Sequence, residues 1–365
     1  MKILKSIMLS GLAFAITGSM FLTSCGGAGN GSKADSSASS DNNSLMGAGS
    51  SFDNPLFSKM FSEYDKANGV KVNYQSIGSG GGIQQLTAKT VDFGASDAPL
   101  NGKQDSALSS PAIHIPVTAG AVVVTYNLPE VKDTLMLTPE VLAKIFLGKI
   151  TKWNDPAIQA INKAVKLPAT GIVISHRSDG SGTTNIFTTY LTKVDKDWEA
   201  GPGKGSSVNW PVGLGGKGNE GVAGSVKQTP GGIGYVELAY AIQNNMAFAK
   251  IQNKAGKFIT PSIASVTAAA NIDIPADSKV SLTNTDAADG YPISGFSWVI
   301  VYKEQKYSDR AADKVTKMVK LIQWMVHDGQ QYSAALNYAP LSAKAVSVAD
   351  AQLKSITYDG KTVLQ

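Results

Sequence analysis

Hydrophobic and polar residues alternate with two different periods from about Leu45 onward. Apolar side chains recur at helical spacing in residues 57–64, and the Asn-Gly pair that follows shortly after is typical of a helix end. A second helical stripe runs through residues 315–326. Period-two alternation or short apolar runs predict strands at residues 70–74, 120–126, 171–175 and 234–237. Because helical and strand segments alternate, the sequence predicts α/β domains with mainly parallel sheets.

The N-terminal residues have a different pattern, which is typical of an export signal. Lys2 and Lys5 precede an apolar stretch over residues 7–22, and no second apolar segment follows that could stop transfer. Residues 22–25, Leu-Thr-Ser-Cys, resemble a bacterial lipobox, in which the chain is cleaved before the cysteine and the cysteine is lipidated. We therefore expect lipidation of Cys25, the single cysteine of the chain; the alternative is an ordinary signal peptide with a chance cysteine.

A tether is expected to separate this signal from the folded part. We expect the signal peptide to occupy residues 1–24 and the tether residues 25–44, which are rich in Gly, Ser, Ala, Asn and Asp. Such a segment has almost nothing apolar to bury, so it predicts a flexible, disordered linker. The chain of 365 residues is too long for one ordinary compact core and suits two domains.

Composition and charge narrow the range of partners. Hydrophobic residues make up 43% of the chain and charged residues 17%, which is normal for a globular protein. The isoelectric point near 9.0 reflects a formal net charge of only +5, and two of the basic residues fall in the predicted signal peptide. Because no run of basic residues concentrates this charge, we expect no nucleic-acid partner.

Three loops rich in glycine and hydroxyl side chains share one arrangement. Residues 47–52 (Gly-Ala-Gly-Ser-Ser-Phe), 78–82 (Gly-Ser-Gly-Gly-Gly) and 178–184 (Ser-Asp-Gly-Ser-Gly-Thr-Thr) each precede a predicted helix. Free backbone N–H groups and the positive end of a helix converge at such a point, where glycine permits close approach and Ser or Thr adds a donor. Arg177 opens the third loop, and its planar fork suits a tetrahedral oxyanion, although a surface salt bridge is the alternative. Together these features predict an oxyanion site.

Catalytic chemistries fit the sequence less well. The loops lack both the spacing of a dinucleotide fingerprint and the Gly-Lys-Ser/Thr ending of a nucleotide P-loop. His114, His176 and His327 have no metal-ligand spacing, and neither a nucleophile elbow with a credible triad nor the Asp-rich two-metal pattern of phosphatases is present. His176 and Arg177 are neighbours on a predicted strand and should point to opposite faces. We expect no enzymatic activity, no cofactor and no metal.

Five stretches together resemble the phosphate-binding protein of the high-affinity bacterial phosphate ABC transporter, the PstS family. The stretches are residues 47–52, 91–100, 177–183, 213–222 and 230–237. The resemblance runs from about Leu45 to near Pro340. It implies an α/β fold of the two-lobed, periplasmic-binding-protein-like type II, with discontinuous lobes joined by a hinge. One lobe would comprise residues 45–118 plus 293–365 and the other residues 119–292.

The resemblance also implies which residues contact phosphate. These contacts carry over to Ser51, Phe52, Ser79, Asp97, Arg177, Ser181, Gly182 and Thr183. Asp179 would hold the arginine fork in place, and Phe52 would contribute its backbone N–H. Asp53 replaces a proline common in the family, which we expect to affect only the local turn. Residues 213–221 are expected to shape the second lobe rather than to touch phosphate.

The function implied is capture of inorganic phosphate in the interlobe cleft and its delivery to the permease subunits of a phosphate ABC transporter. Asp97 would accept the proton that phosphate retains and sulfate lacks. The protein would be an exported monomer, held to the cell envelope by its lipid in the periplasm or on the outer face of the cytoplasmic membrane. The alternatives are an exported phosphatase or phosphate-ester hydrolase, and a surface adhesin or sensor on the same fold.

Overall fold

The computed structural model describes residues 43–364, which lie within one compact unit of residues 41–365. The predicted signal peptide, the predicted lipidation site Cys25 and nearly all of the predicted tether lie outside the described residues. The first strand begins at Ser44, next to the predicted start of folded structure at Leu45.

The described residues form fourteen strands and twelve α-helices. The strands are β1 (Ser44–Gly49), β2 (Lys71–Ser76), β3 (Phe93–Ser96), β4 (Ala112–Tyr126), β5 (Met136–Leu137), β6 (Val173–Arg177), β7 (Leu214–Gly216), β8 (Gly232–Glu237), β9 (Ala247–Phe248), β10 (Lys250–Gln252), β11 (Phe258–Ile259), β12 (Ser294–Tyr302), β13 (Thr357–Tyr358) and β14 (Lys361–Thr362). The helices are α1 (Asn54–Asn68), α2 (Ser79–Thr87), α3 (Gly102–Ala107), α4 (Pro139–Phe146), α5 (Pro156–Ile161), α6 (Gly182–Val194), α7 (Lys196–Ala200), α8 (Gly218–Gln228), α9 (Leu238–Gln243), α10 (Ile263–Ala269), α11 (Ala312–Val326) and α12 (Ala343–Lys354), with short 3-10 helices at Asp328–Tyr332 and Ala334–Leu336.

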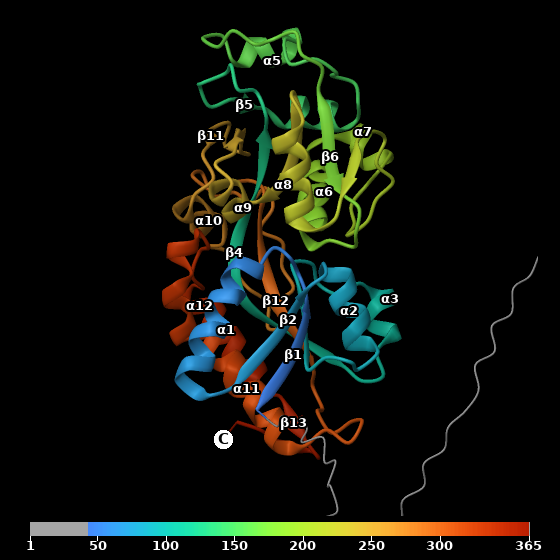
Figure 1. Ribbon diagram of the computed structural model, residues 1–365, viewed down its shortest axis with the longest axis vertical. Helices are drawn as coiled ribbons and strands as arrows, with labels where there is room; N and C mark the ends of the chain where they lie inside the picture. Colours follow the sequence, from blue (N-terminus) through green and yellow to red (C-terminus); the bar gives the residue numbers. More distant parts are fainter. Residues whose placement is uncertain (1–42, 365) are drawn as a thin grey trace, which may run out of the picture. The chain divides into compact units, whose positions relative to one another are not determined.

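One sheet of nine strands runs through this part of the chain, in the order β2-β1-β3-β12-β4-β8-β6-β7, with β9 also paired to β4. The long strand β4 belongs to both halves of the sheet. Its residues 112–121 pair with β12, and its residues 122–126 pair with β8. Two lobes result, which Figure 1 shows at either end of β4. Lobe 1 contains β1, β2, β3 and β12, and lobe 2 contains β6, β7 and β8, which confirms the predicted fold class.

The prediction of mainly parallel sheets is wrong for the centre of the sheet. β1 is parallel to β2 and β3, and β6 is parallel to β7 and β8, as alternating strands and helices require. However, β12 is antiparallel to β3 and β4, and β4 is antiparallel to β8. The reason is topological: β4 carries the chain into lobe 2 and β12 carries it back, so the two strands run in opposite directions.

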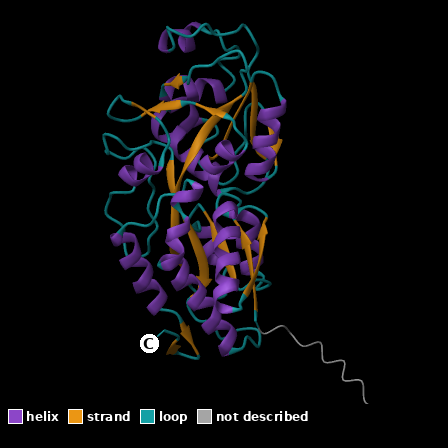
Figure 2. Cartoon of the chain, turned by 60° about the vertical axis from the view of Figure 1, so that its left-hand side comes forward, coloured by secondary structure: helices purple, strands orange, loops and turns teal. Residues whose placement is uncertain are grey.

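Local patterns predicted several elements correctly. The helical stripe of residues 57–64 is buried in α1, which ends at Gly69 in the left-handed conformation (φ 64°), where the Gly69 N–H donates to the Asp65 carbonyl at 2.7 Å. The stripe of residues 315–326 is the buried face of α11. The predicted strand at residues 120–126 is only the second part of β4. Figure 2 shows the helices arranged around the strands in both lobes, so that the sheet is enclosed between them.

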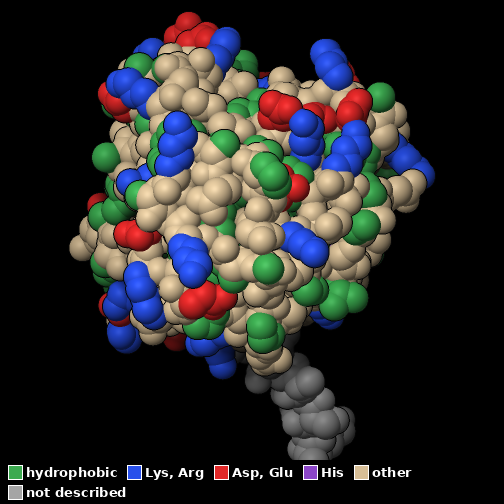
Figure 3. Space-filling model, turned by 90° about the horizontal axis from the view of Figure 1, so that it is seen from above, with side chains coloured by type: hydrophobic (Ala, Val, Ile, Leu, Met, Phe, Trp, Pro, Cys, Tyr) green, Lys and Arg blue, Asp and Glu red, His purple; other side chains and the backbone are tan. Residues whose placement is uncertain are grey.

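The face of the molecule at the α5 end of lobe 2 is mixed in charge. At the α5 end of lobe 2, Lys and Arg side chains are interspersed with Asp and Glu side chains (Figure 3). Between residues 43 and 364, no helix combines the length and the apolar character that crossing a bilayer would need.

Candidate anion-binding site

The three glycine-rich loops lie at helix starts, as the sequence predicts. The first loop leads into α1, the second enters α2 at Ser79, and the third enters α6 at Gly182. Ser181 is the N-cap of α6, and its hydroxyl accepts the Thr184 N–H at 3.0 Å. Each loop therefore presents the positive end of a helix dipole and backbone N–H groups at one edge of the sheet.

Contacts between the second and third loops bring the two lobes together. The Ser79 hydroxyl accepts the Gly182 N–H at 3.0 Å, and the Gly180 carbonyl accepts the Gly80 N–H at 2.9 Å. Gly182 has no room for a side chain, because a Cβ atom there would lie 2.6 Å from the backbone nitrogen of Asp97. These glycines are needed for close approach of backbone to backbone.

Arg177 is buried and held by Asp179. Its Nε donates to Oδ1 of Asp179 at 2.8 Å and its Nη2 to Oδ2 at 2.6 Å, which is a bidentate pair. Its Nη1 donates to the Thr183 hydroxyl at 3.3 Å. Burial acts to raise the pKa of Asp179, but the hydrogen bond and charge of Arg177 outweigh it and the pKa is lowered. Asp179 thus fixes the guanidinium and leaves Nη1 directed at the third loop. His176, on the preceding position of β6, stacks on Trp210 instead, in line with the prediction of opposite faces.

Asp97 receives hydroxyl donors from both lobes. The Ser50 hydroxyl and the Ser297 hydroxyl (3.2 Å) both donate to Oδ1, and the Thr183 hydroxyl donates to Oδ2 at 3.3 Å. Burial raises the pKa of Asp97 to about 6, although the Ser50 hydrogen bond and the Arg177 charge act to lower it. At neutral pH the side chain is therefore a carboxylate, whose oxygens accept hydrogen bonds and cannot donate them.

Ser51 connects the first loop to α8 through a residue that the sequence analysis missed. The Ser51 hydroxyl accepts the backbone N–H of Asn219 at 3.1 Å and its side-chain Nδ2 at 2.9 Å. The same Nδ2 atom lies 3.2 Å from the Thr183 hydroxyl, and Oδ1 of Asn219 accepts the Glu237 N–H at 2.9 Å. Asn219, within residues 213–221, thus also connects lobe 2 to the first loop, and the expectation that these residues shape the second lobe rather than touch phosphate stays a prediction. The sequence offered one local sign of Asn219, a glycine directly before it. That glycine, Gly218, starts α8 in the left-handed conformation (φ 68°).

Phe52 and Asp53 make contacts that the sequence did not predict. The Phe52 N–H donates to the Ser50 hydroxyl at 2.9 Å, and the Phe52 carbonyl accepts the Tyr338 hydroxyl at 2.6 Å. Asp53 affects more than a turn, because its side chain is fully buried and Oδ2 accepts the Ser297 hydroxyl. Oδ1 of Asp53 has no hydrogen-bond partner among the described residues. Burial and the nearby Asp97 charge raise the pKa of Asp53 well above its usual range.

The three histidines occupy separate structural positions. His114 is buried in β4, where its Nε2 accepts the Leu100 N–H at 3.0 Å and burial lowers its pKa to about 3. His327 lies beside Asp350 at 2.8 Å, after the end of α11. No group of three or more His, Cys, Asp or Glu side chains within residues 43–364 is arranged to hold a metal ion.

Comparison with known proteins gives the family. A sequence model of the PBP superfamily domain matches residues 35–328. The phosphate-binding protein PstS of Haemophilus influenzae is 46% identical over 317 residues, which cover 86% of this chain and 93% of the relative. The chain belongs to the PstS family. The phosphate-binding protein PstS of Pasteurella multocida, another member of the PstS family, is 45% identical over 88% of this chain and 93% of the relative.

Solved structures support the PstS-type fold. A high-affinity periplasmic phosphate-binding protein, PfluDING, solved with bound phosphate, superimposes with a TM-score of 0.68 at 18% identity and covers 84% of this chain and 93% of that one. A phosphate-binding protein from Stenotrophomonas maltophilia gives a TM-score of 0.63 at 17% identity over 83% and 92%. At such low identity these two structures bear on the fold alone.

Proposed function

We propose that this PstS-family chain binds inorganic phosphate between its lobes and delivers it to the permease of a phosphate ABC transporter. The proposal rests on one observation: polar side chains and backbone groups from both lobes meet at the lobe junction. Arg177 and the Thr183 hydroxyl, with two further hydroxyls, converge with the carboxylate of Asp97 at helix starts. Several donors beside a carboxylate acceptor suit an oxyanion that keeps a proton. The names of the relatives support the same ligand.

Each predicted contact has a definite chemical part in this proposal. Arg177 supplies the full positive charge, and Asp179 keeps its fork oriented. Ser51, Ser79, Ser181 and Thr183 would supply hydroxyl donors. Phe52 and Gly182 would supply backbone N–H groups, which must first leave the Ser50 and Ser79 hydroxyls to which they donate in this structure. Asp97 accepts the proton of monohydrogen or dihydrogen phosphate. No bond in the ligand is made or broken, and the comparisons give no support to the exported phosphatase that the sequence left open.

The lobe boundaries belong to the proposal as well. We take lobe 1 as residues 45–118 plus 293–365 and lobe 2 as residues 119–292. Support comes from β4, whose partner changes from β12 to β8 between Ala121 and Val122, and from the Val122 N–H, which donates to the Ile293 carbonyl at 2.8 Å. Binding would close the lobes because each supplies donors that the other lacks.

The place of action is proposed from the N-terminal sequence. Export, cleavage before Cys25 and its lipidation would tether the protein near its permease, while residues 25–44 give it reach. Cys25→Ser should abolish lipidation, so the variant should leave the detergent phase in which the wild type partitions. If the variant partitions like the wild type, the anchor does not depend on Cys25.

Calorimetric titration of the purified protein with four oxyanions tests the function. Phosphate and arsenate, which keep a proton near neutral pH, should bind. Sulfate and molybdate, which do not, should bind at least about thirtyfold more weakly, because an unpaired acceptor facing Asp97 costs roughly 2–5 kcal/mol. Absence of phosphate binding would overturn the proposal, and equal affinity for sulfate would overturn the part assigned to Asp97.

A further inference from the structure

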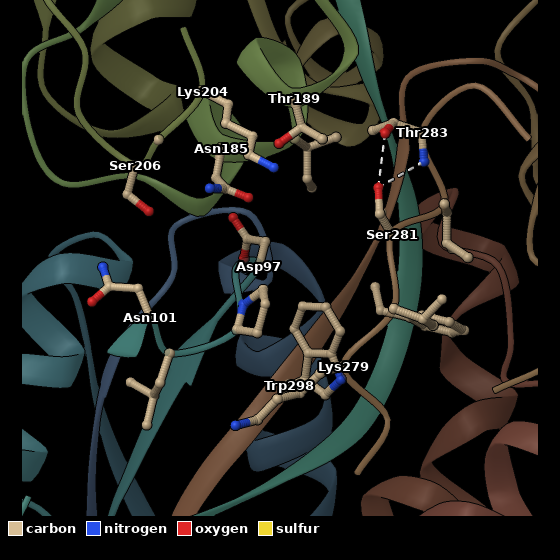
Figure 4. A pocket seen from close by; sticks show the side chains of 18 of the residues that line it. Asp97, Asn101, Asn185, Thr189, Lys204, Ser206, Lys279, Ser281, Thr283 and Trp298 are labelled. Carbon is tan, nitrogen blue, oxygen red and sulfur yellow. Dashed lines mark hydrogen bonds between the residues drawn. The ribbon is translucent and has the colours of Figure 1, made fainter. Parts of the chain in front are cut away.

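A cavity of about 480 Å³ has Asp97 in its wall (Figure 4). Lobe 1 contributes Asp97, Asn101 and Trp298 to its wall, and lobe 2 contributes residues of α6 and of the segments 204–206 and 279–283. Asp97 is thus shared between the candidate anion site and this cavity, which we call the vestibule. None of the residues at its outer end belongs to the contacts predicted for phosphate.

The residues that line the vestibule are exposed at its outer end and buried at its inner end. Asn101 and Lys204 are exposed to solvent. Asp97 and Trp298 are only 3% and 2% exposed. Because one cavity contains both kinds of residue, it joins the surface of the protein to the buried carboxylate. The indole N–H of Trp298 has no hydrogen-bond partner among the described residues, so the wall also holds a donor that a ligand could use.

Two lysines line the vestibule from different sides. Lys204 forms no ion pair with any residue between 43 and 364. Lys279 lies beside Trp298 (Figure 4), and its side chain, 27% exposed, lies 3.6 Å from Asp105 of α3, which is 44% exposed, so this partly exposed pair offsets some of the Lys279 charge. Figure 4 shows Lys204 and Asn185 on the side of the cavity that faces Asp97.

A third lysine adds to this charge from behind the wall. Lys193 donates to the Ser281 hydroxyl at 3.3 Å and to the Thr283 carbonyl at 2.8 Å, and both of these residues line the vestibule. Burial and the charges of Lys204 and Lys254 lower the pKa of Lys193. The acidic groups that face these lysines are Asp97 at the inner end and Asp105 at the rim.

An anion that approaches the site meets an electrostatic difficulty at Asp97. A buried carboxylate repels any oxyanion until its proton and the donors around it are in place. Lys204 and Lys279, which line the same cavity as Asp97, attract the oxyanion and so oppose this repulsion. Charges that line a cleft with low-dielectric walls also raise the local concentration of the ion they attract. Neutral donors in the wall, Asn185 and Ser206 among them, can replace part of the hydration shell.

We infer that the vestibule is a transient anion site, at which Lys204 and Lys279 hold phosphate before it passes Asp97 into the cleft. This inference rests on the proposed function and adds a second, weaker subsite to it. The lysines act on the approach of the ligand, so they govern its association rate and the salt dependence of that rate.

Stopped-flow measurement of phosphate binding by intrinsic tryptophan fluorescence tests the inference. The double variant Lys204→Gln/Lys279→Gln should lower the association rate constant by about fivefold or more at low ionic strength. The difference should shrink as salt is added, since the Debye length is about 10 Å at 0.1 M. Lys204→Glu/Lys279→Glu should lower the rate constant further and reverse its salt dependence.

A matched control separates this local effect from a change in net charge. Lys163, after α5, and Lys361, in β14, are exposed and lie at opposite ends of the described structure. Lys163→Gln/Lys361→Gln removes the same charge and should leave the association rate within a factor of two of wild type. If wild type binds phosphate and the vestibule variants match this control, only the vestibule inference is overturned. If wild type does not bind phosphate, the proposed function falls and the inference with it.

Discussion

Asp97 is buried and receives hydrogen bonds from Ser50, Ser297 and Thr183, so its remaining lone pairs face whatever the cleft holds. A carboxylate in an anion site discriminates between ligands of the same shape. Phosphate near neutral pH offers a proton to it, whereas sulfate presents only acceptors. The hydroxyls around Asp97 strengthen this discrimination, because each donates to the carboxylate and so helps to keep it ionised.

The first prediction therefore concerns Asp97→Asn. An amide can donate as well as accept, so sulfate should gain affinity relative to phosphate by at least about tenfold, part of the roughly 2–5 kcal/mol that an unpaired buried acceptor costs. Paired titrations with both anions on wild type and variant measure the ratio. An unchanged ratio would mean that Asp97 does not accept the ligand proton.

Because the pKa of Asp97 is about 6, wild type should itself lose selectivity against sulfate as the pH falls below that value.

The second prediction concerns Arg177, whose fork is set by Asp179 and whose side chain is 1% exposed. Charge-assisted hydrogen bonds contribute roughly 1.5–3 kcal/mol each, so Arg177→Ala should weaken phosphate binding by at least about tenfold. Arg177→Lys keeps the charge and loses the planar geometry, so its affinity for phosphate should lie between those of wild type and Arg177→Ala. Calorimetry gives all three affinities; a value for Arg177→Ala within a factor of two of wild type would place the ligand elsewhere.

At the scale of elements, the site depends on helix starts that approach one another closely. α6 begins at Gly182, whose missing side chain allows its N–H to reach Ser79 and its backbone to lie against Asp97. A helix start can bind an anion only if nothing stands between its N–H groups and the ligand. The packing of α6 on the Asp97 turn is therefore part of the site.

The third prediction tests this packing with a matched pair of glycines. In Gly182→Ala the new Cβ would lie 2.6 Å from both the nitrogen and Oδ2 of Asp97, so the Asp97 backbone must move, at a cost of about 1–3 kcal/mol. Phosphate affinity should fall by at least about tenfold. Gly224→Ala in α8 meets nothing within 4 Å and should leave affinity unchanged. Equal affinities for the two variants would show that the close approach at Gly182 has no part in binding.

Sequence patterns could predict these elements where the signal is local. Helix ends, glycine loops and apolar stripes involve residues within a few positions, which is why α1 and α11 were predictable. Helices were also expected after the second and third glycine loops, but α2 and α6 begin inside those loops, at Ser79 and Gly182. The antiparallel pairing of β4 with β12 was not predictable, because the pattern of apolar residues within a strand does not indicate which distant strand pairs with it. The same holds for Asn219, which contacts Ser51 across 168 positions, and for Asp53, which contacts Ser297 across 244 positions.

At the scale of the whole molecule, buried carboxyl groups gather where the lobes meet. Asp53 and Asp97 come from lobe 1, and Glu237 comes from the end of β8 in lobe 2. Burial raises the pKa of Glu237 well above its usual range, and the charge of Asp53 adds to the rise. Oε1 of Glu237, like Oδ1 of Asp53, has no hydrogen-bond partner within residues 43–364. The lobe junction therefore favours the protonated forms of Asp53 and Glu237.

This arrangement makes the stability of the ligand-free protein depend on pH in a definite direction. A carboxyl group with a raised pKa in the folded state contributes stability that is complete below its unfolded pKa of about 4 and is lost as the pH rises through the folded pKa. His114 has the opposite effect, because its pKa is lowered to about 3 and its contribution is lost as the pH falls below about 6.5. The pH profile of wild type alone mixes the two, and only a difference between variants isolates the carboxyl groups.

The fourth prediction is that Asp53→Asn becomes more stable relative to wild type as the pH rises from 5 to 8. The amide cannot ionise, so the variant avoids the cost of charging a buried group beside Asp97, while His114 contributes equally to both proteins. Denaturant unfolding without phosphate at several pH values should give a difference that grows by on the order of 1–3 kcal/mol across this range. Asp328→Asn, at an exposed carboxylate, is the control for the loss of one carboxyl group. If the Asp53→Asn difference stays constant over this range, Asp53 is ionised in the folded state as it is in the unfolded state, and burial at the lobe junction does not raise its pKa.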